Sequence, residues 1–314
     1  MTGATSSAAA AAGSSAATAA ASGASAGPAS VFPIGSCDCH VHVIGPADAY
    51  PMVGDRHYTP GLASHDDLLA HLARNGLSRA VIIQPSVYGT DNRCTLDSVR
   101  RLGDAGRAVA VVDDHIDLAG LKQLHAAGVR GLRVNVESAG AQDPQRIVDA
   151  LVYWTGKVAP LGWHVQVYAS LTALAAAIPL LPSLRAPIVL DHFAMVPAGT
   201  PLSALDVTTV LGLVRDGRAY IKLSAAYRIM PVDPSEGDAT AVARLAAAFI
   251  EANAERVLWG SDWPHTNREA GKGPLEVSAY RKISGLVDSA MAWMPDAAVR
   301  QQVLVDNPAR LYGF

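Results

Sequence analysis

The chain has 314 residues, with 25 lysines and arginines against 28 aspartates and glutamates, and its formal charge is −3. Half of the residues are hydrophobic and 17% are charged, which predicts a well-buried core and excludes general disorder. The near-neutral charge and the lack of a lysine or arginine run argue against a nucleic acid or a membrane surface as a partner. No apolar stretch reaches the roughly 18 residues of a membrane span. Three cysteines are too few for a disulfide framework and are typical of a cytoplasmic protein.

The first 30 residues differ from the rest of the chain. They are almost all Ala, Ser, Gly and Thr, with no charged side chain and no aromatic ring. Such small side chains bury too little apolar surface to offset the entropy lost on ordering. We therefore expect residues 1–30 to be a disordered tail, with an atypical export signal as the alternative, and residues 31–314 to form a single domain.

From residue 37 onward, β-rich runs alternate with amphipathic helical stretches. Ser64 and Asp67 form a capping signal before one helical stretch, which Gly76 ends, and Gly128 ends another. Eight strand-then-helix units predict a (β/α)₈ TIM barrel, an α/β fold, with an open doubly wound sheet as the alternative. The predicted strands lie at 37–44, 78–84, 107–112, 129–136, 162–168, 186–192, 218–224 and 256–262.

Polar residues gather at the carboxyl ends of these strands, where such barrels carry their active sites. Because side chains alternate along a strand, Asp38, His40 and His42 should share one face of the first strand, and Cys37 and Cys39 should face away. Any one of these polar residues could be a structural cap or ion pair, but together they predict a site. The others are Arg133 and Asn135, His164, Gln166 and Tyr168, His192, Lys222 and Ser224, and Asp262.

Five segments carry a resemblance to a known family: CDCHVHVIGP, QPSVYGTDN, VLDHFA, WGSDWPH and DNPARLYGF. The chain resembles the amidohydrolase superfamily from about residue 33 to 314, in the branch that contains 2-pyrone-4,6-dicarboxylate lactonase. The resemblance implies a barrel that hydrolyses a lactone or a similar ester. It also implies that His40, His42, His192 and Asp262 are the catalytic residues.

The resemblance bears on metal as well. Tyr168 falls where metal-dependent relatives place a histidine ligand on the fifth strand, and no bridging Lys or Glu is evident on the fourth. We therefore expect no obligatory cofactor, as in the pyrone lactonase. The alternative is one divalent metal ion, zinc, held by His40, His42 and Asp262.

Lactone hydrolysis assigns a role to each of these residues. Asp262 is the candidate base for water, and the three histidines are candidate donors to the carbonyl oxygen as it gains charge. The candidates for binding carboxylate and ring oxygens are Arg133, Arg228, Tyr168, Ser86, Tyr88 and Thr90.

The expected substrate is a small anionic lactone of the pyrone, muconolactone or sugar-acid type. The segment 134–143 lacks an arginine that the pyrone lactonase carries, which favours a smaller or less charged substrate. A lactone isomerase of the same branch, a metal-dependent decarboxylase of the superfamily, and a binding barrel without activity are the alternatives. The sequence makes no prediction of the oligomeric state.

Overall fold

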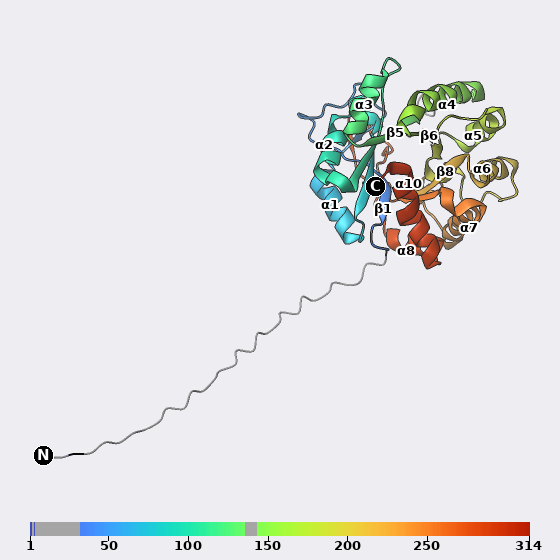
Figure 1. The fold of residues 1–314 in the computed structure, drawn as a ribbon. Helices are drawn as coiled ribbons and strands as arrows, with labels where there is room; N and C mark the ends of the chain where they lie inside the picture. Colours follow the sequence, from blue (N-terminus) through green and yellow to red (C-terminus); the bar gives the residue numbers. More distant parts are fainter. Residues whose placement is uncertain (2, 4–31, 136–142) are drawn as a thin grey trace.

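Eight parallel strands form the centre of the molecule, in a computed structural model that describes residues 1, 3, 32–135 and 143–314 (Figure 1). Neighbouring strands follow one another in chain order, and the last strand returns to the first. The Asp262 N–H donates to the His40 carbonyl at 2.9 Å, and the His42 N–H donates to the Trp263 carbonyl at 2.8 Å. These bonds close the sheet, so the (β/α)₈ barrel is confirmed and the open sheet is wrong. The strands are β1 (Cys37–Val41), β3 (Arg79–Ile83), β4 (Gly106–Ala110), β5 (Val129–Asn135), β6 (His164–Tyr168), β7 (Ile188–Leu190), β8 (Ala219–Ser224) and β9 (Val257–Gly260).

Helices surround the barrel and begin and end where the sequence signals them. Ser64 and Asp67 form a complete capping box at the start of α1, and Gly76 follows its end with a φ of +65°. Gly128 follows α3 with a φ of +97°. The helices are α1 (His65–Arg74), α2 (Arg93–Leu102), α3 (Leu118–Ala126), α4 (Pro144–Val158), α5 (Leu171–Ala177), α6 (Leu205–Arg215), α7 (Glu236–Asn253), α8 (Leu286–Trp293), α9 (Ala297–Gln301) and α10 (Asn307–Tyr312).

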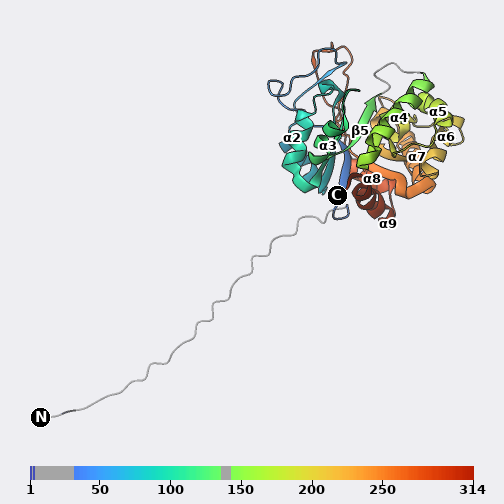
Figure 2. The same ribbon diagram turned by 45° about the horizontal axis from the view of Figure 1, so that its top comes forward.

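Two long loops rise together from one end of the barrel. They carry the short strands β2 (Thr59–Pro60) and β10 (Val277–Ser278), which pair in parallel. Figure 2 shows these loops, in blue and orange, at the end opposite the C-terminus. They follow β1 and β9, so they cover the carboxyl ends of the strands.

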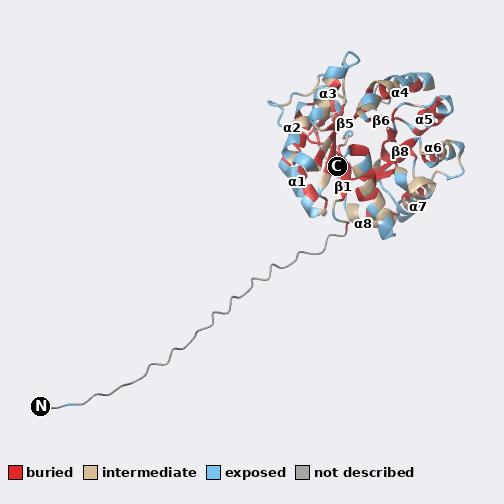
Figure 3. Cartoon of the chain, viewed as in Figure 1, coloured by how far each residue is buried: buried red, intermediate tan, exposed pale blue. Residues whose placement is uncertain are grey.

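The core has two parts, because each strand buries both of its faces (Figure 3). The outer faces of the strands pack against the helices, and an apolar cluster fills the lower barrel interior, where Cys37, Cys39, Val81 and Val109 lie above Tyr312. All three cysteines are buried and free. No helix in the described part of the chain is long and apolar enough to cross a membrane.

The first strand does not alternate as the sequence predicted. The pairing of β1 with β3 shifts register between Asp38 and Val41, and Cys39 lies inside the barrel with Cys37. Asp38 instead lies against α1, with an oxygen 3.3 Å from His71 Nε2. The prediction that Asp38 shares a face with His40, and that the cysteines face away, is therefore wrong. The irregularity slips the alternation by one residue.

The expected tail at 1–30 and the segment 136–142 lie outside the described residues, apart from residues 1 and 3. The side chain of Asn135 also lies outside them, as does most of the segment that lacks the extra arginine.

Candidate active site

The turns after β7, β8 and β9 hold the strained backbone of this protein. Every described non-glycine residue with a positive φ lies there: the turn His192–Met195, Ala225, Asp262 and His265. Such conformations cost about 1–3 kcal/mol each and persist where surrounding contacts enforce them, often at functional sites. Two of the predicted catalytic residues, His192 and Asp262, are among them.

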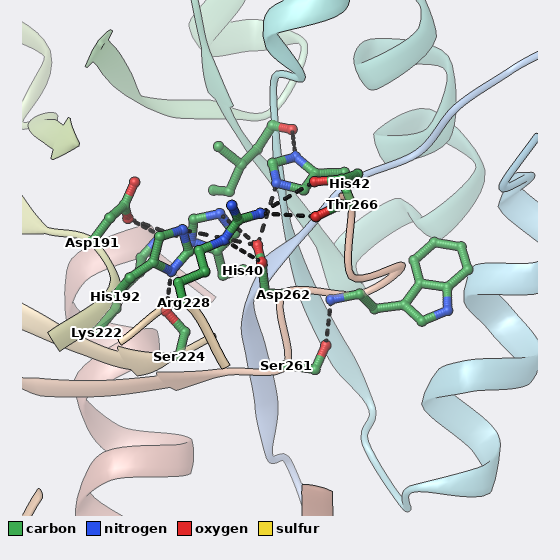
Figure 4. A network of polar contacts seen from close by, with 12 residues as sticks. His40, His42, Asp191, His192, Lys222, Ser224, Arg228, Ser261, Asp262 and Thr266 are labelled. Carbon is green, nitrogen blue, oxygen red and sulfur yellow. Dashed lines mark hydrogen bonds and ion pairs between the residues drawn. The ribbon is translucent and has the colours of Figure 1, made fainter. Parts of the chain in front are cut away.

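His40 lies between two carboxylates at the centre of the site (Figure 4). Its Nδ1 is 3.4 Å from Asp191 Oδ1, and its Nε2 is 3.5 Å from Asp262 Oδ1. All three side chains are fully buried, and none of these four atoms has a hydrogen-bond partner in the structure. Burial lowers the pKa of His40 to about 3 and outweighs the opposite effect of Asp191. His40 is therefore a neutral imidazole with one N–H.

Neighbouring acceptors face the imidazole nitrogens. His42 Nδ1 is 2.8 Å from the Ile83 carbonyl, which can only accept, so His42 donates from Nδ1 and turns Nε2 toward Asp262. His40 faces an ionised acceptor on each side, Asp191 at Nδ1 and Asp262 at Nε2, so its single proton can lie on either nitrogen. His42 Nε2 is 3.5 Å from Asp262 Oδ1. The Nε2 atoms of His40 and His42 and a carboxylate oxygen of Asp262 thus converge on one buried point.

Asp262 is held ionised from its other side. Its Oδ2 accepts hydrogen bonds from the Tyr227 hydroxyl and, at 3.2 Å, from Arg228 Nε. Burial alone would raise the pKa of Asp262, but Arg228 and His192 hold it well below its ordinary value. The unpartnered Oδ1 is therefore the oxygen that can accept a proton from water or bind a cation.

His192 completes the group from the opposite side of His40. Its Nδ1 is 2.9 Å from Ser224 Oγ, and its Nε2 is 4.0 Å from Asp262 Oδ1. Burial lowers the pKa of His192 well below its ordinary value, so the ring is neutral. A hydroxyl can donate as well as accept, so Ser224 allows His192 to carry its proton on Nε2 and donate it toward the centre.

A cavity of about 160 Å³ lies above these residues. Three arginines line it, Arg133, Arg228 and Arg268, and none of its described lining residues is Asp or Glu. Arg133 lies over the Tyr168 ring and 3.4 Å from Asp191, so its guanidinium is held in place. The cavity suits an anionic ligand. Its other lining residues are His42, His57, Tyr58, Pro85, Ser86, Tyr168, His192, Thr266 and Asn267.

The structure brings most of the predicted site residues together. The four predicted catalytic residues meet at the centre, and Arg133, Arg228, Tyr168 and Ser86 line the cavity. Tyr88 and Thr90 are not brought to it. The turn Ser86–Tyr88 buries the Tyr88 ring, whose hydroxyl accepts from the Gly45 N–H at 3.0 Å, and Thr90 is exposed.

Sequence reasoning missed two residues that contact the catalytic group. Asp191 lies beside His40, and its position directly after the apolar run of VLDHFA could have indicated it. Tyr227 donates to Asp262 from the turn after β8, and no local pattern distinguishes it.

The donor set fits a divalent metal ion. His40, His42 and Asp262 present ligand atoms within 4.8 Å of one another, and two imidazoles with a carboxylate are typical zinc ligands. The unpartnered atoms His40 Nε2 and Asp262 Oδ1 both belong to this set. His40, Asp191 and His192 form a second possible set, but Lys222 and Arg133 already lie 3.9 Å and 3.4 Å from Asp191 and compete with a cation there.

Several known proteins are similar to this chain over most of its length. The sequence model of the amidohydrolase family matches residues 37–314. A 2-pyrone-4,6-dicarboxylate hydrolase of Comamonas testosteroni is 33% identical over 287 residues, 89% of this chain and 90% of the relative. A 4-sulfomuconolactone hydrolase of Hydrogenophaga intermedia is 31% identical, covering 90% of each chain. A D-galactarolactone isomerase of Agrobacterium fabrum is 28% identical, covering 91% of this chain and 93% of the relative.

Solved structures share the fold. An apo structure from Agrobacterium tumefaciens has a TM-score of 0.76 at 25% identity and covers 90% of this chain and 97% of its own. An amidohydrolase from Burkholderia multivorans, solved with bound zinc, has a TM-score of 0.61 at 19% identity and covers 89% of this chain and 99% of its own.

Proposed function

Because the chain belongs to the amidohydrolase family, we propose that it opens a carboxylated lactone by directing water onto the carbonyl carbon of the ring ester. One observation carries the proposal. The ionised Asp262 presents an unpartnered oxygen among three imidazoles, beneath a cavity lined by three arginines. Relatives named as lactone hydrolases support the same chemistry.

In this reaction Asp262 Oδ1 accepts the proton of the attacking water and then gives it to the ring oxygen, which leaves as a hydroxyl group when its bond to the carbonyl carbon breaks. His192 Nε2–H is the imidazole donor available to the carbonyl oxygen, because His42 donates to Ile83 and His40 lies between two carboxylates that accept its proton. This narrows the sequence-based expectation that all three histidines donate. Removing one such donor typically lowers the rate by about 10²–10³.

The arginines of the cavity bind the carboxylate of the substrate. Arg228 is anchored by Asp262 and Thr266, and Arg133 by Asp191, so both guanidinium groups are oriented before substrate enters. Ser86 and Tyr168 line the same wall and suit the ring oxygens.

A zinc ion held by His40, His42 and Asp262 would polarise the ester carbonyl and lower the pKa of a bound water. We propose that the ion binds but is dispensable, since Asp262, His192 and the arginines retain their roles without it. We also place the protein in the cytoplasm, which three buried, free cysteines support.

The test is a screen of anionic lactones for ring opening, measured by proton release on protein of known metal content. We expect turnover of at least one pyrone, muconolactone or sugar-acid lactone, and none with Asp262→Asn. Turnover of neutral lactones only, or activity that Asp262→Asn retains, would overturn the proposal.

Lactone isomerisation is the second candidate, favoured by the similarity to the galactarolactone isomerase. Reaction in ¹⁸O-labelled water separates the two. Hydrolysis places one label in the product carboxylate, whereas transfer of the acyl group between hydroxyls of the substrate places none.

A further inference from the structure

A chain of buried polar contacts runs through the barrel interior from β8 to His40. Lys222 Nζ donates to Gln166 Oε1 at 2.7 Å, and Gln166 Nε2 donates to Asp191 Oδ2 at 3.0 Å. Asp191 Oδ1 then lies 3.4 Å from His40 Nδ1. All four residues are at most 1% exposed, and none lines the cavity. Lys222 is thus too deep to touch substrate.

The chemistry of these groups gives the chain a direction. An ammonium can only donate, so the Gln166 amide must turn its oxygen toward Lys222 and its NH₂ toward Asp191. That hydrogen bond engages Asp191 Oδ2, while Oδ1 lies 3.4 Å from His40 Nδ1 and 3.9 Å from Lys222. Asp262 competes for the His40 proton from the Nε2 side, at 3.5 Å. Only with the proton on Nδ1, donated to Asp191, can His40 Nε2 join His42 and Asp262 as a metal ligand.

A buried lysine is costly in a barrel interior that otherwise prefers apolar residues. Asp191 would need compensation in any case, but Arg133 already lies 3.4 Å from it. Lys222 itself lies 3.9 Å from Asp191 Oδ1, so two cations compensate this carboxylate. What Lys222 alone provides is the fixed orientation of Gln166, because Arg133 remains beside Asp191 without it.

We propose that Lys222 is a positioning residue, which acts through Gln166 and Asp191 to fix the nitrogen that His40 presents to Asp262 and His42. Its effect on turnover rests on the proposed function. Its effect on the imidazole and on zinc does not.

The direct test is the tautomer of His40 in ¹⁵N-histidine NMR spectra, with the signal assigned by its absence in His40→Gln. We expect the Nδ1–H form in the wild type and its loss, or a mixture with the Nε2–H form, in Lys222→Met. Tyr220→Phe is the matched control, because Tyr220 precedes Lys222 by two residues on the same strand and contributes to the same interior. It should keep the Nδ1–H form.

Zinc affinity, measured by competition with a chromophoric chelator, gives a second readout. Outer partners of ligating histidines typically change metal affinity by about 10–100-fold, and we expect a loss of this size in Lys222→Met. Gln166→Leu should cause the same loss, and the double variant should add little, because both changes break one chain. Gln166→Leu also serves if Lys222→Met does not fold.

Turnover separates positioning from binding. Lys222→Met should lower kcat and leave KM within about twofold, since Lys222 lies outside the cavity. An unchanged His40 tautomer in Lys222→Met, a wild-type Nε2–H form, or equal zinc losses in Lys222→Met and Tyr220→Phe would overturn the proposal. If the wild type opens no lactone, the proposed function fails while the tautomer still decides the role of Lys222.

Discussion

Two buried histidines mark the two ends of the barrel interior. His40 lies at the carboxyl ends of the strands and His164 deeper, and both are fully buried with both ring nitrogens unpartnered. Burial lowers the pKa of each to about 3. His164, however, packs against Gly131 and the Tyr312 ring, with ring centroids 5.2 Å apart, and forms no ion pair with any described residue. His40, in contrast, lies within 3.5 Å of two carboxylates.

The same uncharged state therefore has different consequences at the two positions. At His164 an uncharged ring fills space, and its cost is an unsatisfied polar group in an apolar setting. At His40 an uncharged ring lies between two carboxylates, so that one nitrogen donates a hydrogen bond and the other can serve the site. Burial sets the charge of a histidine, but its neighbours decide whether it can do chemistry.

The largest expected effect concerns Asp262, the carboxylate beside His40 at the carboxyl ends of the strands. Asp262→Asn keeps the size of the side chain but removes the basic oxygen, so kcat should fall by about 10²–10⁴. Steady-state turnover of the lactone found in the screen measures this, with circular dichroism as the check on folding. A variant that keeps more than about a tenth of the wild-type rate would show that Asp262 is not the base.

Substitution of one glycine beside each histidine, Gly260 and Gly131, tests the two ends of the barrel interior. A Cβ at Gly260 would lie 2.6 Å from His40 Cβ, and one at Gly131 would lie 2.4 Å from the His164 ring. Both Gly→Ala changes should destabilise the fold by about 1–3 kcal/mol through overpacking. Only Gly260→Ala should also lower kcat/KM, by about 10–100-fold, because a misplacement of about 1 Å at a catalytic group costs that much.

Urea unfolding and steady-state kinetics on both variants check this pair. Equal losses of kcat/KM in Gly260→Ala and Gly131→Ala would mean that activity follows stability. The exact position of His40 would then have no separate effect on activity.

The next prediction concerns two arginines that line the cavity above His40. Arg133→Met or Arg228→Met removes charge-assisted hydrogen bonds worth about 1.5–3 kcal/mol each, so KM for an anionic lactone should rise by about 10–100-fold. A neutral lactone of the same ring should be affected much less. Equal changes in KM for both lactones would assign these arginines a structural role.

Metal removal should have a smaller effect. We expect the protein to bind one zinc ion and to keep more than about a tenth of its activity after stripping. Asp262→Asn should weaken the binding, because it replaces an anionic ligand by a neutral one. Elemental analysis, prolonged chelation and metal re-addition measure this. Activity that is lost on stripping and restored by zinc would make the ion obligatory.

The smallest expected effect concerns His164, in the deeper part of the barrel interior. The pKa of His164 is about 3 in the folded protein and near 6.5 in the unfolded chain, so below pH 6.5 the unfolded chain binds a proton that the folded protein does not. His164 therefore lowers the free energy of unfolding as the pH falls. Between pH 6 and pH 5 the free energy of unfolding should therefore fall by about 1 kcal/mol less in His164→Leu than in the wild type. Urea unfolding at both pH values would contradict this if the two proteins changed equally.

The sequence predicted the strands closely, because alternation and apolar runs are local properties. The predicted ends were at most three residues off: 186–192 shortens to Ile188–Leu190, and 256–262 to Val257–Gly260. His192 and Asp262 thus lie in the turns rather than on the strands, in the strained conformations that direct them inward. Their identity was readable from strand-end position, whereas their conformation was not.

Sequence alone determined the barrel, the catalytic residues His40, His42, His192 and Asp262 as candidates, and the two arginines of the cavity. Those depend on residue type, on position at the predicted strand ends and on the resemblance to a known family. Tertiary structure decided that Cys39 faces inward, that Asp191 and Tyr227 join the site, and that Tyr88 does not. Each of these depends on pairing between strands or on contacts between residues up to about 150 positions apart, as with His40 and Asp191, which no local pattern encodes.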